Sequence, residues 1–281
     1  VHWIYDTKLL ESKYGRVESF RKPEPESYHP TKNIGEFTHY GDQSLVLLES
    51  LHHCGGRFDL LDFSARWRNL FLDYQGYMDG ATKGTLANLA AQKSASEAGS
   101  SSSDLAGAAR MAPLIYFARK DIESLIRDVR LQTQMTHTNR NTVDSAEFFA
   151  RCALSALNGE KPAAAMRKIA GDHFAGTIIE SWVDKGLQSI QEDSVQAILK
   201  IGQTCHTPHA FPGVVHLIAK YENNYREALI QNVMAGGDSA ARGMMVGMIL
   251  GASLGWSALP EDWLAALRKR EQIVKLLDQD L

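Results

Sequence analysis

The chain has 281 residues and a formal net charge of −3, with 44% hydrophobic and 22% charged residues. This balance is typical of a globular protein with a sizeable core, and the small net charge argues against nucleic acid or an anionic membrane surface as a partner. No apolar run reaches the roughly 18 residues that a membrane span needs. The three cysteines lie far apart, which favours a reducing compartment, so we predict a cytoplasmic protein.

Apolar residues recur at helical spacing along most of the chain, and no run of alternating β-branched residues bounded by turns stands out. We therefore predict an all-α fold, a single large orthogonal bundle of about ten to thirteen helices in one domain over residues 1–281. Because the chain begins abruptly at a Val, we also expect a short segment to precede it. The clearest expected helices cover residues 45–51, 60–74, 122–135, 146–157, 176–190, 195–201, 214–233 and 260–277.

Asp42 lies just before the expected helix that starts at Leu45. A short acidic side chain there is typical of a helix N-cap, which stabilises a helix by about 1 kcal/mol. The positive end of the helix dipole also favours anionic ligands, and a carboxylate there can hold a metal ion between ligand and protein. The local sequence leaves the capping role and the functional role open.

Two connecting segments follow in the middle of the chain. Six of the ten residues from 94 to 103 are serine, a composition that predicts a flexible surface loop. His137 lies between two expected helices, where a histidine side chain can either contact a ligand or cap a helix. The residue pattern does not decide between these two roles.

Residues 235–255 begin with two glycines and Asp238, which predicts a helix capped by Asp238. Arg242 lies four residues further on, so an ion pair within the helix is also available. Each glycine inside a helix costs roughly 1 kcal/mol relative to alanine, so we expect close packing to offset the cost. We predict a buried central helix whose glycine face meets another helix backbone to backbone. The glycines of this face recur every four residues, at Gly243, Gly247, Gly251 and Gly255.

Several ordered segments resemble the ADP-ribosylglycohydrolase superfamily, all-α proteins that typically cleave ADP-ribose from modified side chains with a pair of Mg²⁺ or Mn²⁺ ions. Residues 35–51 resemble its glycine, aromatic, Thr-Asp-Asp-Thr and helix segment. Residues 104–113 resemble the Gly-Asn-Gly-Ala-x-Arg-x-x-Pro segment that helps to form the ADP-ribose pocket, and residues 135–137 resemble its Thr-His turn. Residues 235–263 resemble the closing Gly-Gly-Asp-Thr-Asp-Ser helix with its Ile-Pro-x-x-Trp tail. The J-type lens crystallins and selenoprotein J are relatives of this superfamily.

The chain departs from the family at the residues that hold the metal ions. Tyr40-Gly41-Asp42-Gln43 stands in place of Thr-Asp-Asp-Thr, so one of the two carboxylates is lost. In the closing helix, the residues that follow Asp238 are serine and then alanine in place of Thr-Asp. The family's glutamate ligand would fall near the start of the chain and is not seen, and Asp-Leu-Ala at 104–106 replaces Gly-Asn-Gly.

The resemblance implies a set of site residues. Asp42 and Asp238 would be the catalytic carboxylates, and with Ser239 they would be the remaining metal ligands. Two carboxylates poorly compensate two divalent cations, so we expect one Mg²⁺ or Mn²⁺ ion, or none with Arg242 or His39 supplying the positive charge. The substrate-binding residues that the resemblance implies are His137, Arg110, Gly107 and Gly237.

Three functions remain open at this stage. The first is a divergent hydrolase of an ADP-ribosyl or related glycosidic bond, acting on a small-molecule or ADP-ribosylated substrate with a reduced or altered metal site. The second is a protein that binds ADP-ribose or another nucleotide without cleaving it, which needs only the pocket and the helix N-termini. The third is a structural, crystallin-like protein on the same fold.

Overall fold

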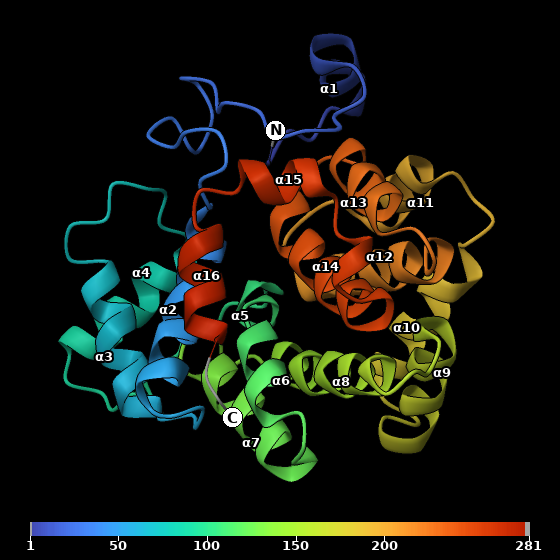
Figure 1. Cartoon of the computed structure of the whole chain (residues 1–281). Coiled ribbons are helices and arrows are strands. Elements are labelled where there is room, and N and C mark those ends of the chain that lie inside the picture. Colours follow the sequence, from blue (N-terminus) through green and yellow to red (C-terminus); the bar gives the residue numbers. More distant parts are fainter. Residues whose placement is uncertain (1, 279–281) are drawn as a thin grey trace. The chain divides into compact units, whose positions relative to one another are not determined.

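The computed structural model describes residues 2–278, and helices joined by turns and loops make up this part of the chain. No β-strand occurs within it; Ser100 and His137 form only an isolated bridge. The prediction of an all-α fold is therefore confirmed (Figure 1). The labels run to α16, more than the expected number of helices, because short helices such as α5 (Ala106–Ala109) give no periodic pattern in a window of about 11–18 residues.

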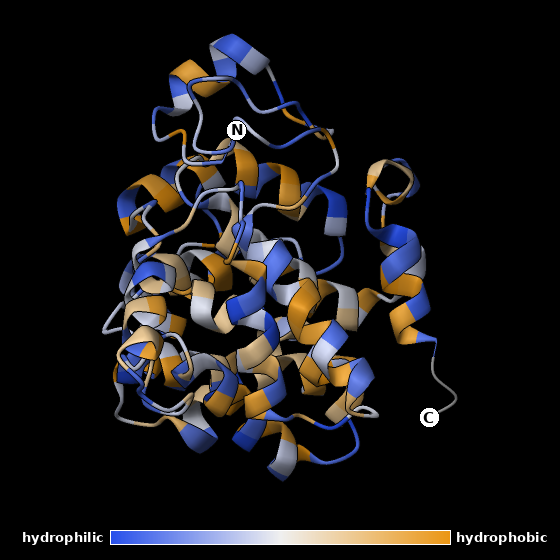
Figure 2. Cartoon of the chain, turned by 90° about the vertical axis from the view of Figure 1, so that its left-hand side faces the viewer, coloured by the Kyte–Doolittle hydropathy of each residue, from blue (hydrophilic) through white to orange (hydrophobic). Residues whose placement is uncertain are grey.

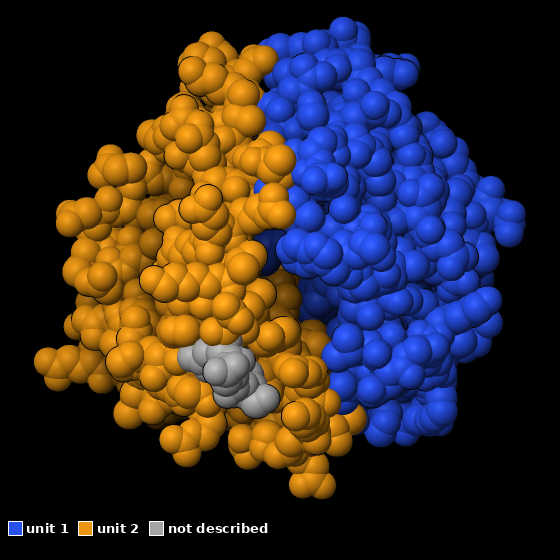
Figure 3. Space-filling view, viewed as in Figure 1, with its two compact units in different colours: residues 1–21, 151–264 blue, residues 22–150, 265–281 orange. Residues whose placement is uncertain are grey.

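The chain divides into two compact units, each assembled from separate stretches of sequence (Figure 3). Unit 1 comprises residues 1–21 and 151–264, and unit 2 comprises residues 22–150 and 265–281. The chain passes between the units three times: between Arg21 and Lys22, within α8 (Arg140–Leu157) and within α15 (Glu261–Ala266). That residues 1–281 form a single domain stays a prediction.

Unit 1 is built around α12, which packs against α10, α11 and α14. Residues such as Phe211, Val214 and Leu217 of α12 are fully buried, so this helix lies in the core of the unit. The helices of unit 1 besides parts of α8 and α15 are α1 (Thr7–Tyr14), α9 (Pro162–His173), α10 (Ile178–Gln188), α11 (Ser194–Ile201), α12 (Thr207–Lys220), α13 (Tyr225–Met234), α14 (Ser239–Leu254) and the short 3₁₀ helix η1 (Trp256–Ala258).

Unit 2 is built around α2, which packs against α3, α6 and the C-terminal α16. Trp67 and Phe63 of α3 are fully buried in its core. Helix α16 is tied to α2 by a hydrogen bond of 3.0 Å between His52 Nδ1 and the carbonyl oxygen of Leu276. The helices of unit 2 besides parts of α8 and α15 are α2 (His39–His53), α3 (Leu60–Leu70), α4 (Gly80–Ala90), α5, α6 (Ala112–Ala118), α7 (Ile122–Gln134) and α16 (Arg270–Leu277).

The glycine face of α14 lies against α13, but side chains rather than backbone fill the space. A Cβ atom at Gly243 would lie 2.9 Å from Nδ2 of Asn232, and one at Gly247 would lie 3.2 Å from the hydroxyl of Tyr225. The predicted backbone-to-backbone packing is therefore wrong, because two polar side chains of α13 enter the groove that the glycines leave. The opposite face, with Met245, is buried in the core.

Figure 2 shows hydrophobic and hydrophilic residues interspersed along the helices. Among residues 2–278, none of the helices combines the length and the apolarity that crossing a membrane requires. The three cysteines, all within this part of the chain, carry free thiols. The cytoplasmic location stays a prediction.

Candidate functional site

Asp42 lies in the first turn of α2, which begins at His39 with Thr38 at the N-cap position. The prediction that Asp42 precedes a helix starting at Leu45 is therefore wrong. The helix extends further towards the N-terminus because His39 and Tyr40 are buried, with exposed fractions of 0% and 3%. Since Thr38 holds the cap position, the fold does not use Asp42 as an N-cap.

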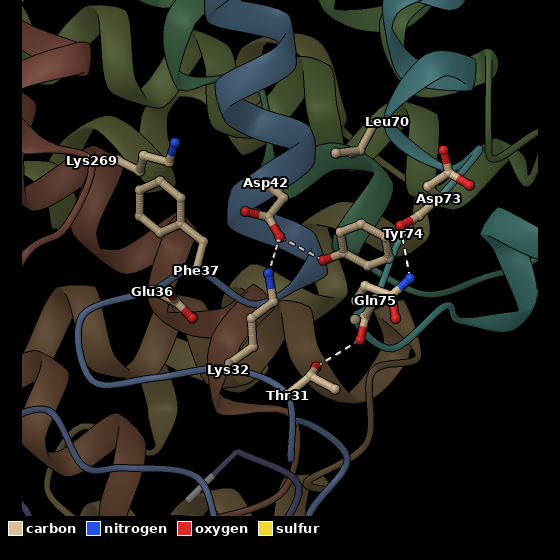
Figure 4. A pocket seen from close by; sticks show the side chains of 11 residues that line it. Thr31, Lys32, Glu36, Phe37, Asp42, Leu70, Asp73, Tyr74, Gln75 and Lys269 are labelled. Carbon is tan, nitrogen blue, oxygen red and sulfur yellow. Dashed lines mark hydrogen bonds and ion pairs between the residues drawn. The ribbon is translucent and has the colours of Figure 1, made fainter.

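The carboxylate of Asp42 forms an ion pair and a hydrogen bond through one oxygen (Figure 4). Its Oδ2 atom accepts from Lys32 Nζ at 2.6 Å and from the hydroxyl of Tyr74 at 2.5 Å. The Lys32 ammonium also lies 5.1 Å from the centre of the Tyr74 ring. Burial, together with the hydrogen bond and charge of Asp42, raises the pKa of Tyr74 far above its ordinary value, so the phenol stays protonated and acts as a donor.

Asp42 and Lys32 line a pocket of about 330 Å³ within unit 2 (Figure 4). One wall is the Phe37 ring, which packs so closely on Gly41 that a Cβ atom there would lie 2.7 Å from the ring. Lys269 reaches the pocket from the C-terminal segment. The lining is mixed in charge and rich in hydrogen-bonding groups: Thr31, Lys32, Glu36, Phe37, Asp42, Leu70, Asp73, Tyr74, Gln75, Gly76 and Lys269.

A second polar group in unit 2 contains His137. His137 Nε2 lies 2.8 Å from Asp104 Oδ1, and His137 Nδ1 lies 2.8 Å from Thr136 Oγ1. The same threonine oxygen accepts from Arg110 Nη2 at 2.6 Å. Burial works to raise the pKa of Asp104, but the charge and hydrogen bond of His137 outweigh it and lower the pKa.

The buried guanidinium of Arg110 is satisfied by protein groups. Its Nε donates to Gln132 Oε1 at 2.8 Å, and its Nη1 donates to Gln43 Oε1 at 3.2 Å. Burial lowers the pKa of Arg110 to about 10. A Cβ atom at Gly107 would lie 2.5 Å from His137 Nδ1, so only glycine leaves room for this ring. The sequence-predicted residues Arg110, Gly107 and His137 are thus brought together, and their role in substrate binding stays a prediction.

The serine-rich segment 94–103 is held in place beside His137. Ser100 N donates to the carbonyl of Thr136 at 2.9 Å, and Thr138 N donates to the carbonyl of Ser100 at 2.8 Å. Ala98 in the same segment is fully buried. The segment is a loop with exposed residues such as Ser94 and Ser101, as predicted, but backbone hydrogen bonds that composition does not reveal anchor it at Ser100; its flexibility stays a prediction.

Unit 2 also contains a buried histidine–aspartate pair that the sequence did not predict. His39 Nε2 lies 3.1 Å from Asp79 Oδ2, and Asp79 also caps α4 by accepting from Thr82 N at 2.6 Å. Burial opposes ionisation of Asp79, but its hydrogen bond and charge interaction with His39 lower its pKa. Asp79 before Gly80 is itself a readable N-cap signal, whereas nothing in the sequence links it to His39.

Asp238 caps α14 as predicted. Its Oδ1 atom accepts from Ala241 N at 3.2 Å and lies 2.8 Å from His2 Nε2. Only 1% of Asp238 is exposed. Ser239 is also buried, and its carbonyl accepts from Asn232 Nδ2 at 2.7 Å. Asp238 and Ser239 belong to unit 1, whereas Asp42 belongs to unit 2.

Gly237 and Arg242 complete the start of α14. Gly237 has a φ of +65°, and a Cβ atom there would lie 2.2 Å from the carbonyl of Gln203, so both backbone angle and space require glycine. Arg242 Nη2 donates to the carbonyls of Asn232 and Gly236 at 3.0 and 2.7 Å, in place of the predicted pair with Asp238 within the helix. Burial lowers the pKa of Arg242 to about 10, although the charge of Asp238 opposes this shift.

A pair of divalent cations needs several oxygen ligands close together. Among residues 2–278, no three or more His, Cys, Asp and Glu side chains are grouped so as to hold a metal ion. At Asp42 the partner is the Lys32 ammonium, which has no lone pair for a metal, and at Asp238 it is His2. These local donor sets do not fit two metal ions, and the metal-binding roles of Asp42, Asp238 and Ser239 stay predictions.

The sequence model of the ADP-ribosylglycohydrolase family matches residues 1–281. The chain belongs to this family. A solved structure described as an "ADP-ribosylglycohydrolase-related protein complex" superposes with a TM-score of 0.73 at 22% identity, covering 93% of this chain and 85% of that chain. At this identity the likeness shows the fold, and it confirms the predicted architecture.

Crystallins are among the relatives of this ADP-ribosylglycohydrolase family member. Crystallin J1A of Tripedalia cystophora is 26% identical over 307 aligned positions, covering 99% of this chain and 90% of the crystallin. Crystallin J1B of the same organism is 24% identical over 297 positions, with the same coverages. An uncharacterised protein of Archaeoglobus fulgidus is 26% identical, covering 95% of this chain and 86% of that protein. The predicted relation to J-type crystallins is confirmed.

Proposed function

We propose that this chain is a ligand-binding member of the ADP-ribosylglycohydrolase family, which recognises ADP-ribose or a related nucleotide without the two-metal hydrolysis of the family. The observation that carries the proposal is the ion pair between Lys32 and Asp42 inside the pocket of unit 2. A carboxylate neutralised by an ammonium group is a poor ligand for a divalent cation, whereas it still offers hydrogen bonds to a neutral polar ligand.

The pocket supports recognition of a sugar-sized group. Its volume of about 330 Å³ lies near the lower end of the range for small-molecule sites. The rings of Phe37 and Tyr74 supply apolar surface, while Asp42 and Gln75 can accept hydrogen bonds from hydroxyl groups. Within residues 2–278 no protein hydrogen bond reaches Asp42 Oδ1, so this oxygen can accept from a ligand hydroxyl.

The family scaffold also occurs in proteins named as crystallins, which fits a chain without the full set of metal ligands. A ligand-binding role uses more of this structure than a purely structural role does. A structural protein needs no pocket lined by paired charged groups, whereas Asp42 and Lys32 line such a pocket with 16% and 18% of their side chains exposed.

A hydrolase of an ADP-ribosyl or related glycosidic bond is the second candidate, and Asp42 itself favours it. Thr38 and not Asp42 occupies the cap position of α2, so this carboxylate does not serve as the N-cap of the helix. A carboxylate beside a ligand pocket is suited to general-base activation of water. In this case Asp42 would act with Lys32 and Tyr74 as its charge and hydrogen-bond partners.

Binding and turnover should be measured on the same protein. Calorimetric titration with ADP-ribose is expected to show saturable binding that Asp42→Asn weakens at least tenfold. Asp73→Asn, which makes the same charge change at the exposed rim of the pocket, serves as the matched control and should bind within about twofold of the parent.

Turnover of ADP-ribosylated peptide and of O-acetyl-ADP-ribose, with and without Mg²⁺, separates the two candidates. The proposal predicts no turnover that Mg²⁺ stimulates. Mg²⁺-stimulated hydrolysis that Asp42→Asn abolishes would overturn it and establish a metal-assisted hydrolase. Absence of ADP-ribose binding at millimolar concentration, with the protein folded, would also overturn the proposal.

A further inference from the structure

We propose that the Lys32 ammonium is a built-in cation that takes the place of a divalent metal ion at Asp42. The inference deepens the proposed function, because both rest on the Lys32–Asp42 ion pair, but its test measures metal binding and not ADP-ribose binding. It also predicts a gain of function, because removal of the lysine should open a site for a divalent cation at Asp42.

The contact between the two side chains is direct. Lys32 Nζ lies 2.6 Å from Asp42 Oδ2, a distance typical of a charge-assisted hydrogen bond. Mg²⁺ would need a carboxylate oxygen at about 2.0–2.1 Å and further oxygen ligands around it. An ammonium group carries a positive charge, which repels a metal cation. It has no lone pair to donate, so it cannot serve as a metal ligand. Lys32 therefore competes directly with a divalent cation for Oδ2, and its positive charge opposes a cation at the neighbouring Oδ1.

Tyr74 strengthens this competition. Its hydroxyl donates to the same Oδ2 atom at 2.5 Å, so two donors already occupy the oxygen that Lys32 contacts. A cation that approached this oxygen would have to displace both the ammonium and the phenol proton. Figure 4 shows Lys32 and Tyr74 converging on Asp42 from different sides of the pocket.

The loop that carries Lys32 is anchored on both sides, so the ammonium reaches Asp42 from a defined position. Lys32 N donates to the carbonyl of His29 at 3.1 Å. The neighbouring Thr31 donates through its hydroxyl to the carbonyl of Gln75 at 2.7 Å. Asn33 N donates to Glu36 Oε2 at 2.7 Å. These bonds order the backbone before and after Lys32, which reduces the entropy cost of holding its long side chain.

Lys269 provides an internal comparison. It is a second lysine that lines the same pocket and comes from the C-terminal segment. The ion pair with the carboxylate of Asp42, however, is formed by Lys32. Removal of either lysine changes the charge of the pocket by the same amount. If the inference is correct, only the removal of Lys32 frees the carboxylate for a metal.

The test is a titration with Mn²⁺, followed by the electron paramagnetic resonance signal of the free ion. The parent protein and Asp42→Asn are expected to bind Mn²⁺ equally. Lys32→Met should gain one site at least tenfold tighter than any site of the parent, and the double variant Lys32→Met/Asp42→Asn should lose it. Lys269→Met is the matched control and should behave as the parent does.

Two results would overturn the inference. One is Mn²⁺ binding by the parent that Asp42→Asn removes, because Lys32 would then not exclude the ion. The other is a folded Lys32→Met variant, verified by circular dichroism, that gains no site. If Lys32→Met does not fold, the comparison of the parent with Asp42→Asn decides alone: equal binding supports the inference and a loss contradicts it. The ADP-ribose titration is a separate measurement, so failure of either proposal is distinguishable from failure of the other.

Discussion

Asp42 in unit 2 and Asp238 in unit 1 are the same residue type at the start of a long helix, yet their surroundings differ. Asp238 is buried, caps α14 through Ala241 N and contacts His2. Asp42 leaves the cap position of α2 to Thr38 and opens into a pocket with a lysine beside it. The comparison teaches that the fold uses the carboxylate of Asp238, whereas the carboxylate of Asp42 is paired with Lys32 and keeps one oxygen open to a ligand.

The largest effect should follow from Asp238→Ala, which removes an N-cap and leaves the neighbouring His2 without this acceptor. We expect a loss of about 3 kcal/mol in the free energy of unfolding, since a cap contributes about 1 kcal/mol and a broken buried pair costs more. Urea unfolding measures it. Asp238→Asn keeps an oxygen for the cap and should lose less. A loss below about 1 kcal/mol for Asp238→Ala would remove the structural half of the comparison.

Gly107→Ala tests packing within unit 2, which contains the pocket, and leaves every carboxylate in place. The new Cβ atom would lie 2.5 Å from His137 Nδ1, so the ring must shift and strain its hydrogen bonds. We expect a destabilisation of about 2 kcal/mol in urea unfolding. Gly171→Ala is the matched control, because Gly171 lies within α9 and a Cβ atom there meets nothing within 4 Å. The control should be neutral or stabilising by up to about 1 kcal/mol.

The pH dependence of stability tests the core of unit 1. His216 hydrogen-bonds to Ser189 and Ser194, and burial lowers its pKa from 6.5 to about 4. Between these two pH values the unfolded chain binds more protons than the folded chain does. The stability that neutral His216 contributes is therefore complete above pH 6.5 and is lost as the pH falls towards 4. The loss should be on the order of 2 kcal/mol, measured by urea unfolding at several pH values.

His216→Gln should flatten that pH dependence, whereas the exposed His173→Gln should leave it unchanged. An unaltered slope in His216→Gln would mean that other groups carry the dependence.

The smallest stability effect should follow from Asp42→Asn, which is the other half of the comparison. Since Asp42 does not cap α2 and its ion pair is partly exposed, we expect a change below about 1 kcal/mol in urea unfolding. A loss as large as that of Asp238→Ala would show that both carboxylates serve the fold. The comparison between the units would then fail.

Much of the fold was predictable because helical periodicity is a local signal. The cap at Asp238 was also predictable, since Gly-Gly-Asp before an apolar helix is a local pattern. The start of α2 was not, because burial of His39 and Tyr40 and not their helix propensity extends the helix.

The pairs that define the candidate site join residues from different structural elements. Lys32 reaches Asp42 from an irregular loop, and the close approach of Gly107 to His137 joins residues far apart in sequence. Periodicity and spacing carry no signal for such contacts. Resemblance to the family singled out Asp42, Gly107 and His137, but nothing in the sequence indicated Lys32 as a partner of Asp42.

The division of the sequence between the two units has a consequence for synthesis on the ribosome. Residues 22–150 emerge early, yet unit 2 also needs residues 265–278, whose backbone bonds Gly35 through Arg268 N at 3.0 Å. Helix α16 then covers α2 through the contact of Leu276 with His52. A nascent chain therefore exposes part of α2 until residues 265–278 have left the ribosome, and the pocket gains Lys269 only in that step.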